Sequence, residues 1–230
     1  VSIAVLSSVL VTNTASDADV PVDELTYELQ VAPAGATISA AGVISWTSGL
    51  EHVDTTQTFR TVVRDNGLPA MSATNEFTVF VEPIHNGPTI AASIEAVVNE
   101  GSLLRITNPA SSTDIPQLDF SYQLYEAPLG AAVDGNGVIA WVPTEAQGPS
   151  TNHFIMVVTD SGTPSISATS MVQIVVAEVN TAPTLPAQSN QSIAELTTLT
   201  LTNRATDSDV PANGLSYRLE GAPAGATING

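Results

Sequence analysis

The sequence contains no cysteine and no lysine. Without cysteine, neither a disulfide bond nor a thiolate metal ligand can form, so stability must come from packing and from other ligands. The five basic residues are all arginines and are outnumbered by 23 acidic residues, which gives a net charge of −18. Such a surface repels nucleic acid and anionic membranes and attracts cations. We therefore expect neither nucleic acid nor a membrane surface as a partner.

Aromatic residues and long hydrophobic runs are also scarce. Aromatics make up 5% of a chain that is 43% hydrophobic, so aliphatic side chains must fill any core. No run of apolar residues is long enough to predict a membrane span. Gly-x-Ser-x-Gly, phosphate-binding glycine loops and His-Glu-x-x-His are absent as well, which predicts a protein that is not an enzyme. The three histidines share no metal-ligand spacing and are predicted to be surface residues.

An internal repeat organises what is present. Tyr27, Tyr122 and Tyr217 lie 95 residues apart (122 − 27 and 217 − 122), each within a similar strand-like segment. Trp46 and Trp141 keep the same interval, as do the segments 65–69 and 160–164. A period of this length exceeds that of solenoid repeats, so each copy is expected to be a small domain.

Within a copy, apolar and polar residues alternate between turns rich in Gly, Pro, Asn and Asp. This period of two indicates strands, and no apolar stripe of helical period is found. We predict an all-β fold of tandem Greek-key β-sandwiches, each with seven strands, arranged end to end with partial repeats at both termini. For the middle copy, the predicted strands are 92–98, 102–107, 119–125, 130–133, 137–142, 153–159 and 169–178. Trp141 and Tyr122 are expected to cross its core, with their polar atoms bound to loop backbone.

The predicted domains are 1–86, a repeat that lacks most of its first strand; 87–181, a complete repeat; and 182–230, the N-terminal half of a third. We expect the chain to be a segment of a longer array. The third copy would expose an apolar face unless it is completed by further sequence or by another chain.

A family resemblance follows from the order of these motifs. A Glu-x-Asn-x-x-Pro link at 178–183 precedes a glutamate, Asp-x-Asp at 207–209 and a tyrosine strand. Elsewhere the first two copies carry Gly-Val-Ile-x-Trp, and the second carries Asp-x-Gly-x-Pro-x-Ile-Ser-Ala at 160–168, where the first has Met71 in place of the isoleucine. This pattern resembles the cadherin-like (Ig-like) repeats of bacterial surface proteins, including the dystroglycan-type cadherin variant. The resemblance covers nearly the whole chain and implies calcium ions at the junctions between repeats, adhesion and an extracellular location.

Carried over by position, the resemblance implies calcium ligands at two junctions and at the N-terminal repeat. The second junction would use Glu100, Glu178, Asn180, Asp207 and Asp209, and Glu145 is a further candidate. The first junction would use Glu82, Asp114 and Asp160, with Glu51 and Asp54 as helpers and His85 as a poor ligand. Asp17, Asp19 and Asp65 would face a preceding domain.

The first junction is the weaker of the two, because Val5 occupies the position of Glu100 and Ser112 that of Asp207. Calcium takes six to eight oxygen ligands, and its affinity rises with the number of carboxylates. The alternative to calcium is structural, since Asp-x-Asp-x-Pro is also a common turn whose side chains accept bonds from nearby backbone N–H groups.

Three functions remain open. The first is a non-enzymatic, calcium-stiffened stalk or adhesin segment of a large extracellular, cell-surface protein, whose partners are neighbouring repeats and, beyond them, surface proteins or glycans. The second is a subunit of an extracellular filament, sheath or surface layer that polymerises through strand complementation. The third is a carbohydrate-binding module, which needs an exposed aromatic platform.

Overall fold

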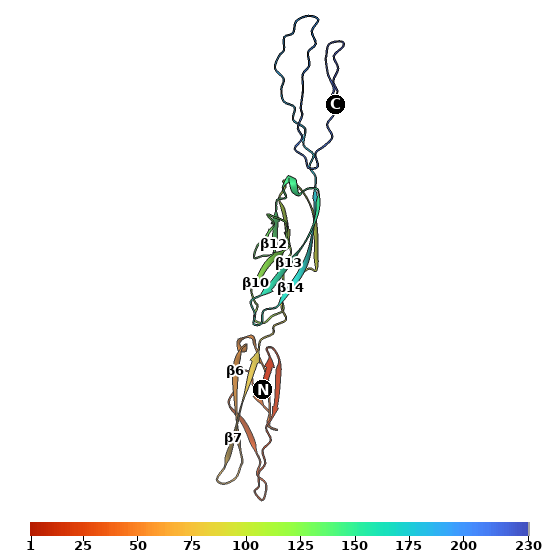
Figure 1. The fold of residues 1–230 in the computed structure, drawn as a ribbon. Helices are drawn as coiled ribbons and strands as arrows, with labels where there is room; N and C mark the ends of the chain where they lie inside the picture. The colour runs from red at the N-terminus through yellow and green to blue at the C-terminus, as the bar shows by residue number, and fades with distance from the viewer. Residues whose placement is uncertain (230) are drawn as a thin grey trace. The chain divides into compact units, whose positions relative to one another are not determined.

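The computed structural model describes residues 1–229, and their regular structure is all-β (Figure 1). No α-helix occurs among these residues, only the single 3₁₀ turns η1 (Leu50–His52) and η2 (Glu145–Gln147). The all-β prediction is therefore confirmed. Among the described residues, no helix is long and apolar enough to cross a membrane.

The chain divides into two compact units that do not follow the repeat boundaries. The first unit contains Val1–Thr89, Ala110–Ser121 and Val158–Ala168, and the second contains Ile90–Pro109, Tyr122–Val157 and Thr169–Gly230. Each unit holds one cluster of buried apolar side chains. The domain boundaries inferred from the repeat stay a prediction.

The first seven strands form two sheets. A four-stranded sheet has the order β1-β7-β6-β3, and a three-stranded sheet has the order β2-β5-β4. The long pair β6 and β7 is antiparallel, whereas the short β1 runs parallel to β7 (Figure 1). The strands are β1 (Ser2–Ala4), β2 (Ser8–Thr12), β3 (Thr26–Val31), β4 (Thr37–Ile38), β5 (Val43–Thr47), β6 (Thr55–Arg64) and β7 (Ser72–Glu82).

The next seven strands repeat this arrangement. Their sheets have the orders β10-β13-β14-β8 and β11-β12-β9, and β8 runs parallel to β14. Each strand overlaps one of the ranges predicted from the sequence. They are β8 (Ser93–Asn99), β9 (Leu104–Thr107), β10 (Phe120–Tyr125), β11 (Ala132–Val133), β12 (Val138–Trp141), β13 (Ser150–Asp160) and β14 (Ser167–Ala177).

Alternation along the strands buries one face of each long strand. Phe154 and Met156 on β13 are buried, and so are Val172, Ile174 and Val176 on β14, as the period of two predicts. Full burial of an apolar side chain of this size stabilises a fold by about 1.5–3 kcal/mol. On β6, Val62 is buried as well, although the alternation predicts it on the outer face.

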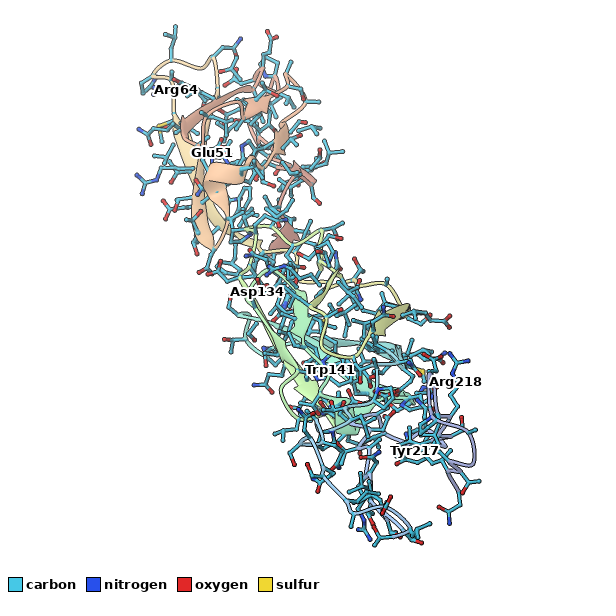
Figure 2. The ribbon with its side chains drawn as sticks, turned by 90° about the horizontal axis from the view of Figure 1, so that it is seen from above. Glu51, Arg64, Asp134, Trp141, Tyr217 and Arg218 are labelled. Carbon is cyan, nitrogen blue, oxygen red and sulfur yellow. The ribbon has the colours of Figure 1, made fainter. Side chains whose placement is uncertain are left out.

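The two tryptophans are anchored in the same way. Trp46 and Trp141 are each 1% exposed, and their indole N–H groups donate to the carbonyl oxygens of Ala34 and Leu129, both at 3.2 Å. Those carbonyls belong to the Ala-Pro-x-Gly turns. The predicted core position of Trp141 is thus confirmed, and Figure 2 shows it among the strands of the second unit.

Residues 178–229 contain none of the strand ladders seen in the first two copies. A single bridge joins Thr184 to Thr206. One local feature of the repeat is retained, because the Tyr217 hydroxyl accepts a bond from the N–H of Ala205 at 2.9 Å, as Tyr27 does from Ala15 at 3.2 Å. Large apolar side chains such as Leu196 are fully exposed here.

Candidate metal centre

Three glutamates of the second unit meet where the parallel pair β8 and β14 ends. The ladder closes with Asn99 opposite Ala177, so the next residues, Glu100 and Glu178, leave the sheet side by side. Glu145 comes from the turn η2. One carboxylate oxygen from each of the three lies within 4.8 Å of the others. Strand register and one 3₁₀ turn therefore create a dense negative site.

Several oxygens in this glutamate cluster have no hydrogen-bond partner. Glu100 is only 6% exposed, and its Oε1 accepts a bond from the N–H of Val179 at 2.8 Å, while its Oε2 is buried and unpartnered. Both carboxylate oxygens of Glu178 are likewise buried without a partner. Unpaired buried carboxylate oxygens are strongly unfavourable, because they lose water and gain nothing in return.

The charges in the cluster act on one another. Burial raises the pKa of Glu178, and the neighbouring carboxylates Glu100, Glu145 and Asp209 raise it further. Glu145 Oε1 also accepts a bond from the N–H of Val210 at 3.0 Å. Glu178 is thus repelled by the other two glutamates of the cluster and by Asp209 beside it, and a bound cation would offset this repulsion.

Asp209 is fixed by the link that follows β14. It is 2% exposed and accepts bonds from the N–H and hydroxyl of Thr181 and from the amide of Asn213. These hydrogen bonds, foremost that from the Thr181 hydroxyl, lower its pKa despite burial. Asp209 therefore brings a full negative charge to the cluster at neutral pH.

The donor set fits calcium. Glu100, Glu145 and Glu178 offer only oxygen, and at least three of their oxygens are unpartnered and buried. Calcium prefers carboxylate oxygen ligands and completes its shell with carbonyl oxygens and water. Of the other predicted ligands, Asp207 accepts a bond from the N–H of Asp209 and Asn180 accepts one from Asn213, and neither belongs to the group of three.

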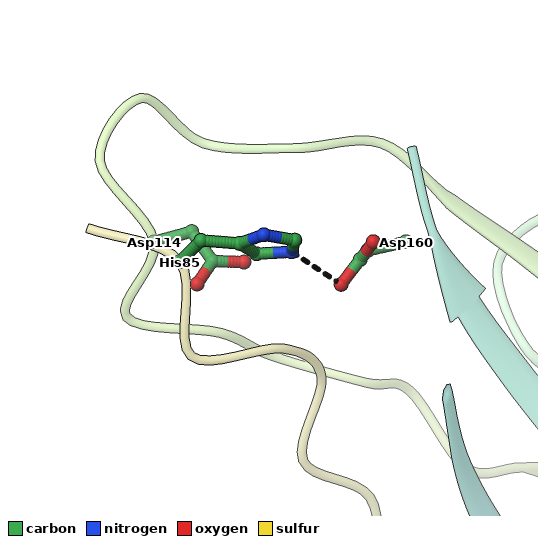
Figure 3. A group of neighbouring side chains, drawn as sticks. All are labelled: His85, Asp114 and Asp160. Carbon is green, nitrogen blue, oxygen red and sulfur yellow. Dashed lines mark hydrogen bonds and ion pairs between the residues drawn. The ribbon is translucent and has the colours of Figure 1, made fainter. Parts of the chain in front are cut away.

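A second cluster lies in the first unit and joins two predicted ligands to the histidine that the sequence analysis named as a poor calcium ligand. Asp114 and Asp160 lie with His85, whose Nε2 is 3.0 Å from Asp160 Oδ2 (Figure 3). Glu82, Glu51 and Asp54 are not part of this group. Val5, which occupies in the first copy the position of Glu100, is 2% exposed and packs in the core. This cluster therefore differs from the glutamate cluster in its ligand types.

A third group gathers at the turn after β2. Asp17 and Asp19 approach Asp23, which the sequence analysis did not predict as a ligand. Burial raises the pKa of Asp23, and Asp17, Asp19 and Asp65 add to the shift. Asp65 itself accepts bonds from the N–H groups of Gly67 and Met71, which is a turn role. These acids have no unpartnered buried oxygen among the described residues.

Two of the three histidines are not surface residues, contrary to the prediction. The side chain of His52 is 12% exposed; it packs edge-on against Trp46 and its Nδ1 accepts the N–H of Gly49 at 2.9 Å. The side chain of His85 is 21% exposed. His153 is exposed as predicted. Sequence spacing missed His85 because its partner Asp160 comes from a distant segment, whereas His52 is covered by its own turn and by Trp46 on the preceding strand.

The pKa shifts predict how stability responds to pH in the presence of a chelator. Glu178 has a raised pKa in the folded state, so the folded chain takes up this proton first, and the free energy of unfolding should rise as pH falls from neutral toward the ordinary value of 4.5. At lower pH it should fall, because four aspartates with lowered pKa values then become protonated; they are Asp114, Asp134, Asp160 and Asp209. Urea titrations at a series of pH values measure this. A steady decline from pH 7 to 4.5 would contradict the expectation.

Comparison with known proteins adds structural likenesses only. No sequence family and no curated protein matches the chain. The chain is similar to a crystal structure of human CDH23 EC21-23, with 22% identity and a TM-score of 0.47, over 90% of this chain and 83% of that one. The likeness to mouse Cadherin-23 EC22-24 has 21% identity and a TM-score of 0.44, over 70% of this chain and 56% of that one. The likeness to the Protocadherin GammaB4 extracellular domain has 18% identity and a TM-score of 0.41, over 76% of this chain and 33% of that one. The residues of this chain itself carry the proposals that follow.

Proposed function

We propose that this chain is a non-enzymatic segment of a large extracellular repeat protein, and that calcium at the glutamate cluster rigidifies it. The observation that carries the proposal is the set of unpartnered buried oxygens on Glu100 and Glu178. Without a cation, these charges destabilise the second unit; with one, they become ligands.

Glu100, Glu145, Glu178 and Asp209 would hold the ion. They come from the end of β8, from η2, from the residue after β14 and from the segment beyond the link. When bound, calcium supplies positive charge that offsets their repulsion. Its hold on four separate segments would restrict their motion, as a cross-link does.

An extracellular location suits such a site. Extracellular calcium modules operate at roughly 10⁻⁴–10⁻³ M calcium. The acidic charge of −18 favours cations and disfavours nucleic acid. Adhesion, a bacterial cell surface, and neighbouring repeats or glycans as partners rest on the cadherin-like motif order.

Calcium titration followed by thermal unfolding tests the proposal. With calcium at 100 times its Kd, the folded state gains about 2.7 kcal/mol. For a unit of roughly 100 residues, each kcal/mol shifts Tm by about 4–8 °C. We expect EDTA to reverse the shift and magnesium at equal concentration to reproduce little of it. An unchanged Tm in both calcium and EDTA would refute the calcium site and leave the fold intact.

A second function is favoured by the exposed apolar side chains beyond β14. Leu185, Ile193, Leu196 and Leu199 are between 44% and 103% exposed. A strand from an identical chain could cover them, which is the basis of a filament or surface layer assembled by strand complementation. Light scattering over a range of protein concentrations tests this, and a strictly monomeric chain would exclude it. Both tryptophans are buried, so neither supplies the exposed aromatic platform on which a carbohydrate-binding module would depend.

A further inference from the structure

The cluster of His85, Asp114 and Asp160 differs chemically from the glutamate cluster. One ring nitrogen and one oxygen from each carboxylate lie within 4.8 Å of one another, all within the first unit. His85 precedes the link residue Asn86, Asp114 lies in the segment after β9, and Asp160 ends β13. Figure 3 shows the imidazole pointing toward the carboxylate of Asp160, with the side chain of Asp114 next to the histidine.

Backbone N–H groups hold one oxygen of each aspartate. Asp114 Oδ1 accepts bonds from Asn86 at 2.6 Å and Gly87 at 3.2 Å. Asp160 Oδ1 accepts bonds from Gly162 and Ile166, both at 3.0 Å. The two Oδ1 atoms are thus occupied, and each carboxylate keeps only its Oδ2 for another partner.

The Oδ2 of Asp114 has no such partner. Asp114 is 1% exposed, and this oxygen is buried without a hydrogen bond. The hydrogen bond from Asn86 lowers the pKa of Asp114 in spite of its burial, so the carboxylate is ionised at neutral pH. A buried carboxylate oxygen without a hydrogen bond, next to an imidazole nitrogen, is a position that a bound cation would stabilise.

The ligand types decide which cation fits. Calcium needs six to eight oxygens, whereas here two carboxylate oxygens and an imidazole nitrogen are on offer. Zinc binds imidazole nitrogen and carboxylate oxygen at about 2.0–2.2 Å with four ligands in total, so two of its ligands lie roughly 3.3 Å apart. His85 Nε2 and Asp160 Oδ2 are 3.0 Å apart, close to that spacing.

We propose that His85, Asp114 and Asp160 form a zinc site, separate from the glutamate cluster, at a junction where the family resemblance implies calcium. His85 and Gly162 line a cavity of about 270 Å³, from which water would reach the imidazole side of the site and complete the coordination. In this arrangement zinc takes the place of the direct contact between His85 and Asp160 and neutralises both carboxylates.

Gly162 makes room for the imidazole. A Cβ at this position would collide with Cε1 and Nε2 of the His85 ring. Its backbone is outside the left-handed region, so Gly162→Ala changes the space available to His85 without backbone strain. The variant therefore displaces the histidine while all three ligands remain in the chain.

Isothermal titration with ZnCl₂ in saturating calcium, which fills the glutamate cluster, tests the proposal. We expect one zinc per wild-type chain and a Kd for His85→Gln at least 100-fold weaker, since loss of a mere supporting residue already costs 10–100-fold. Gly162→Ala should weaken zinc binding in the same direction. The matched controls are His153→Gln, at an exposed histidine, and Gly135→Ala, where a Cβ meets no atom within 4 Å.

NMR of the three imidazole rings supplies an independent readout. Zinc should shift the ring signals of His85 and leave those of His52 and His153 in place. Zinc bound equally by the wild type and His85→Gln, or a wild type that binds none, would overturn the proposal. If His85→Gln does not fold, Gly162→Ala decides: wild-type zinc affinity in that variant also overturns it. A calcium site that fails its own test leaves this result unaffected.

Discussion

Replacing Glu178 by glutamine is expected to raise the melting temperature of the chelator-treated protein and to abolish most of the stabilisation by calcium. The two effects have opposite signs because the carboxylate destabilises the fold when no cation is bound and acts as a ligand when one is. In chelator, the substitution removes a charge that Glu100, Glu145 and Asp209 repel. The amide can also donate to the unpartnered Oε2 of Glu100.

The loss of calcium stabilisation is expected to be larger than the gain in stability in chelator. Loss of one carboxylate from a calcium site weakens binding, because affinity follows the ligand charge. If the Kd of the variant rises 100-fold, calcium at 100 times the wild-type Kd stabilises it by only about 0.4 kcal/mol instead of about 2.7. Differential scanning calorimetry in EDTA and in calcium measures both arms.

Glu95→Gln is the matched control. Glu95 lies on β8, the strand that directly precedes Glu100, but it is exposed and does not belong to the glutamate cluster. It makes the same change in net charge, so it corrects for the general effect of charge on an acidic chain. Were Glu178→Gln to melt below the wild type in EDTA, or to gain as much from calcium, the glutamate cluster would not be a cation site.

Replacing Trp141 by alanine should cost about 3–5 kcal/mol and should loosen the second core without loosening the first. Trp141 is 1% exposed and packs with Ile139, Phe154 and Met156. The variant also leaves the carbonyl of Leu129 without its indole donor. Because small proteins are stable by only about 5–15 kcal/mol, this loss is large.

Trp46→Ala provides the reciprocal test, since Trp46 occupies the equivalent place in the first core beside Phe59. Hydrogen exchange followed by peptide mass spectrometry reads the two cores separately. Each variant should increase exchange in the strands of its own core and leave the other protected. Equal loosening of both cores by either tryptophan variant would mean one cooperative core, against the two clusters seen in the structure.

The strands could be predicted because their signals are local. Alternation with a period of two, ended by Gly, Pro and Asp turns, marks β13 and β14 without any knowledge of what they pack against. Copies spaced by 95 residues then assign the same role to Trp46 and Trp141. The turn glycines Gly35 and Gly130 have φ values of +81° and +91°, a conformation that side chains disfavour and that their sequence context predicts.

The candidate sites were predicted only in part. Glu100, Glu178 and Asp209 follow from the motif order, and they lie together or interact in the structure. The chemistry at His85 did not follow, because it depends on a distant glycine that leaves space for the ring. Asp23 was missed for a different reason: it is only four residues from Asp19, but no motif pointed to it, and the conformation of the loop brings it to Asp17 and Asp19.

The sequence by itself determined the all-β class, the strand positions and the buried tryptophans, because backbone propensity and side-chain periodicity act over a few residues. Only the tertiary structure decided which acids meet and which of their oxygens lose every partner. Those properties depend on strand register, as where Asn99 pairs with Ala177, and on hydrogen bonds such as those to Asp114 Oδ1. Register and burial arise from contacts between distant segments, so no local pattern in the chain contains them.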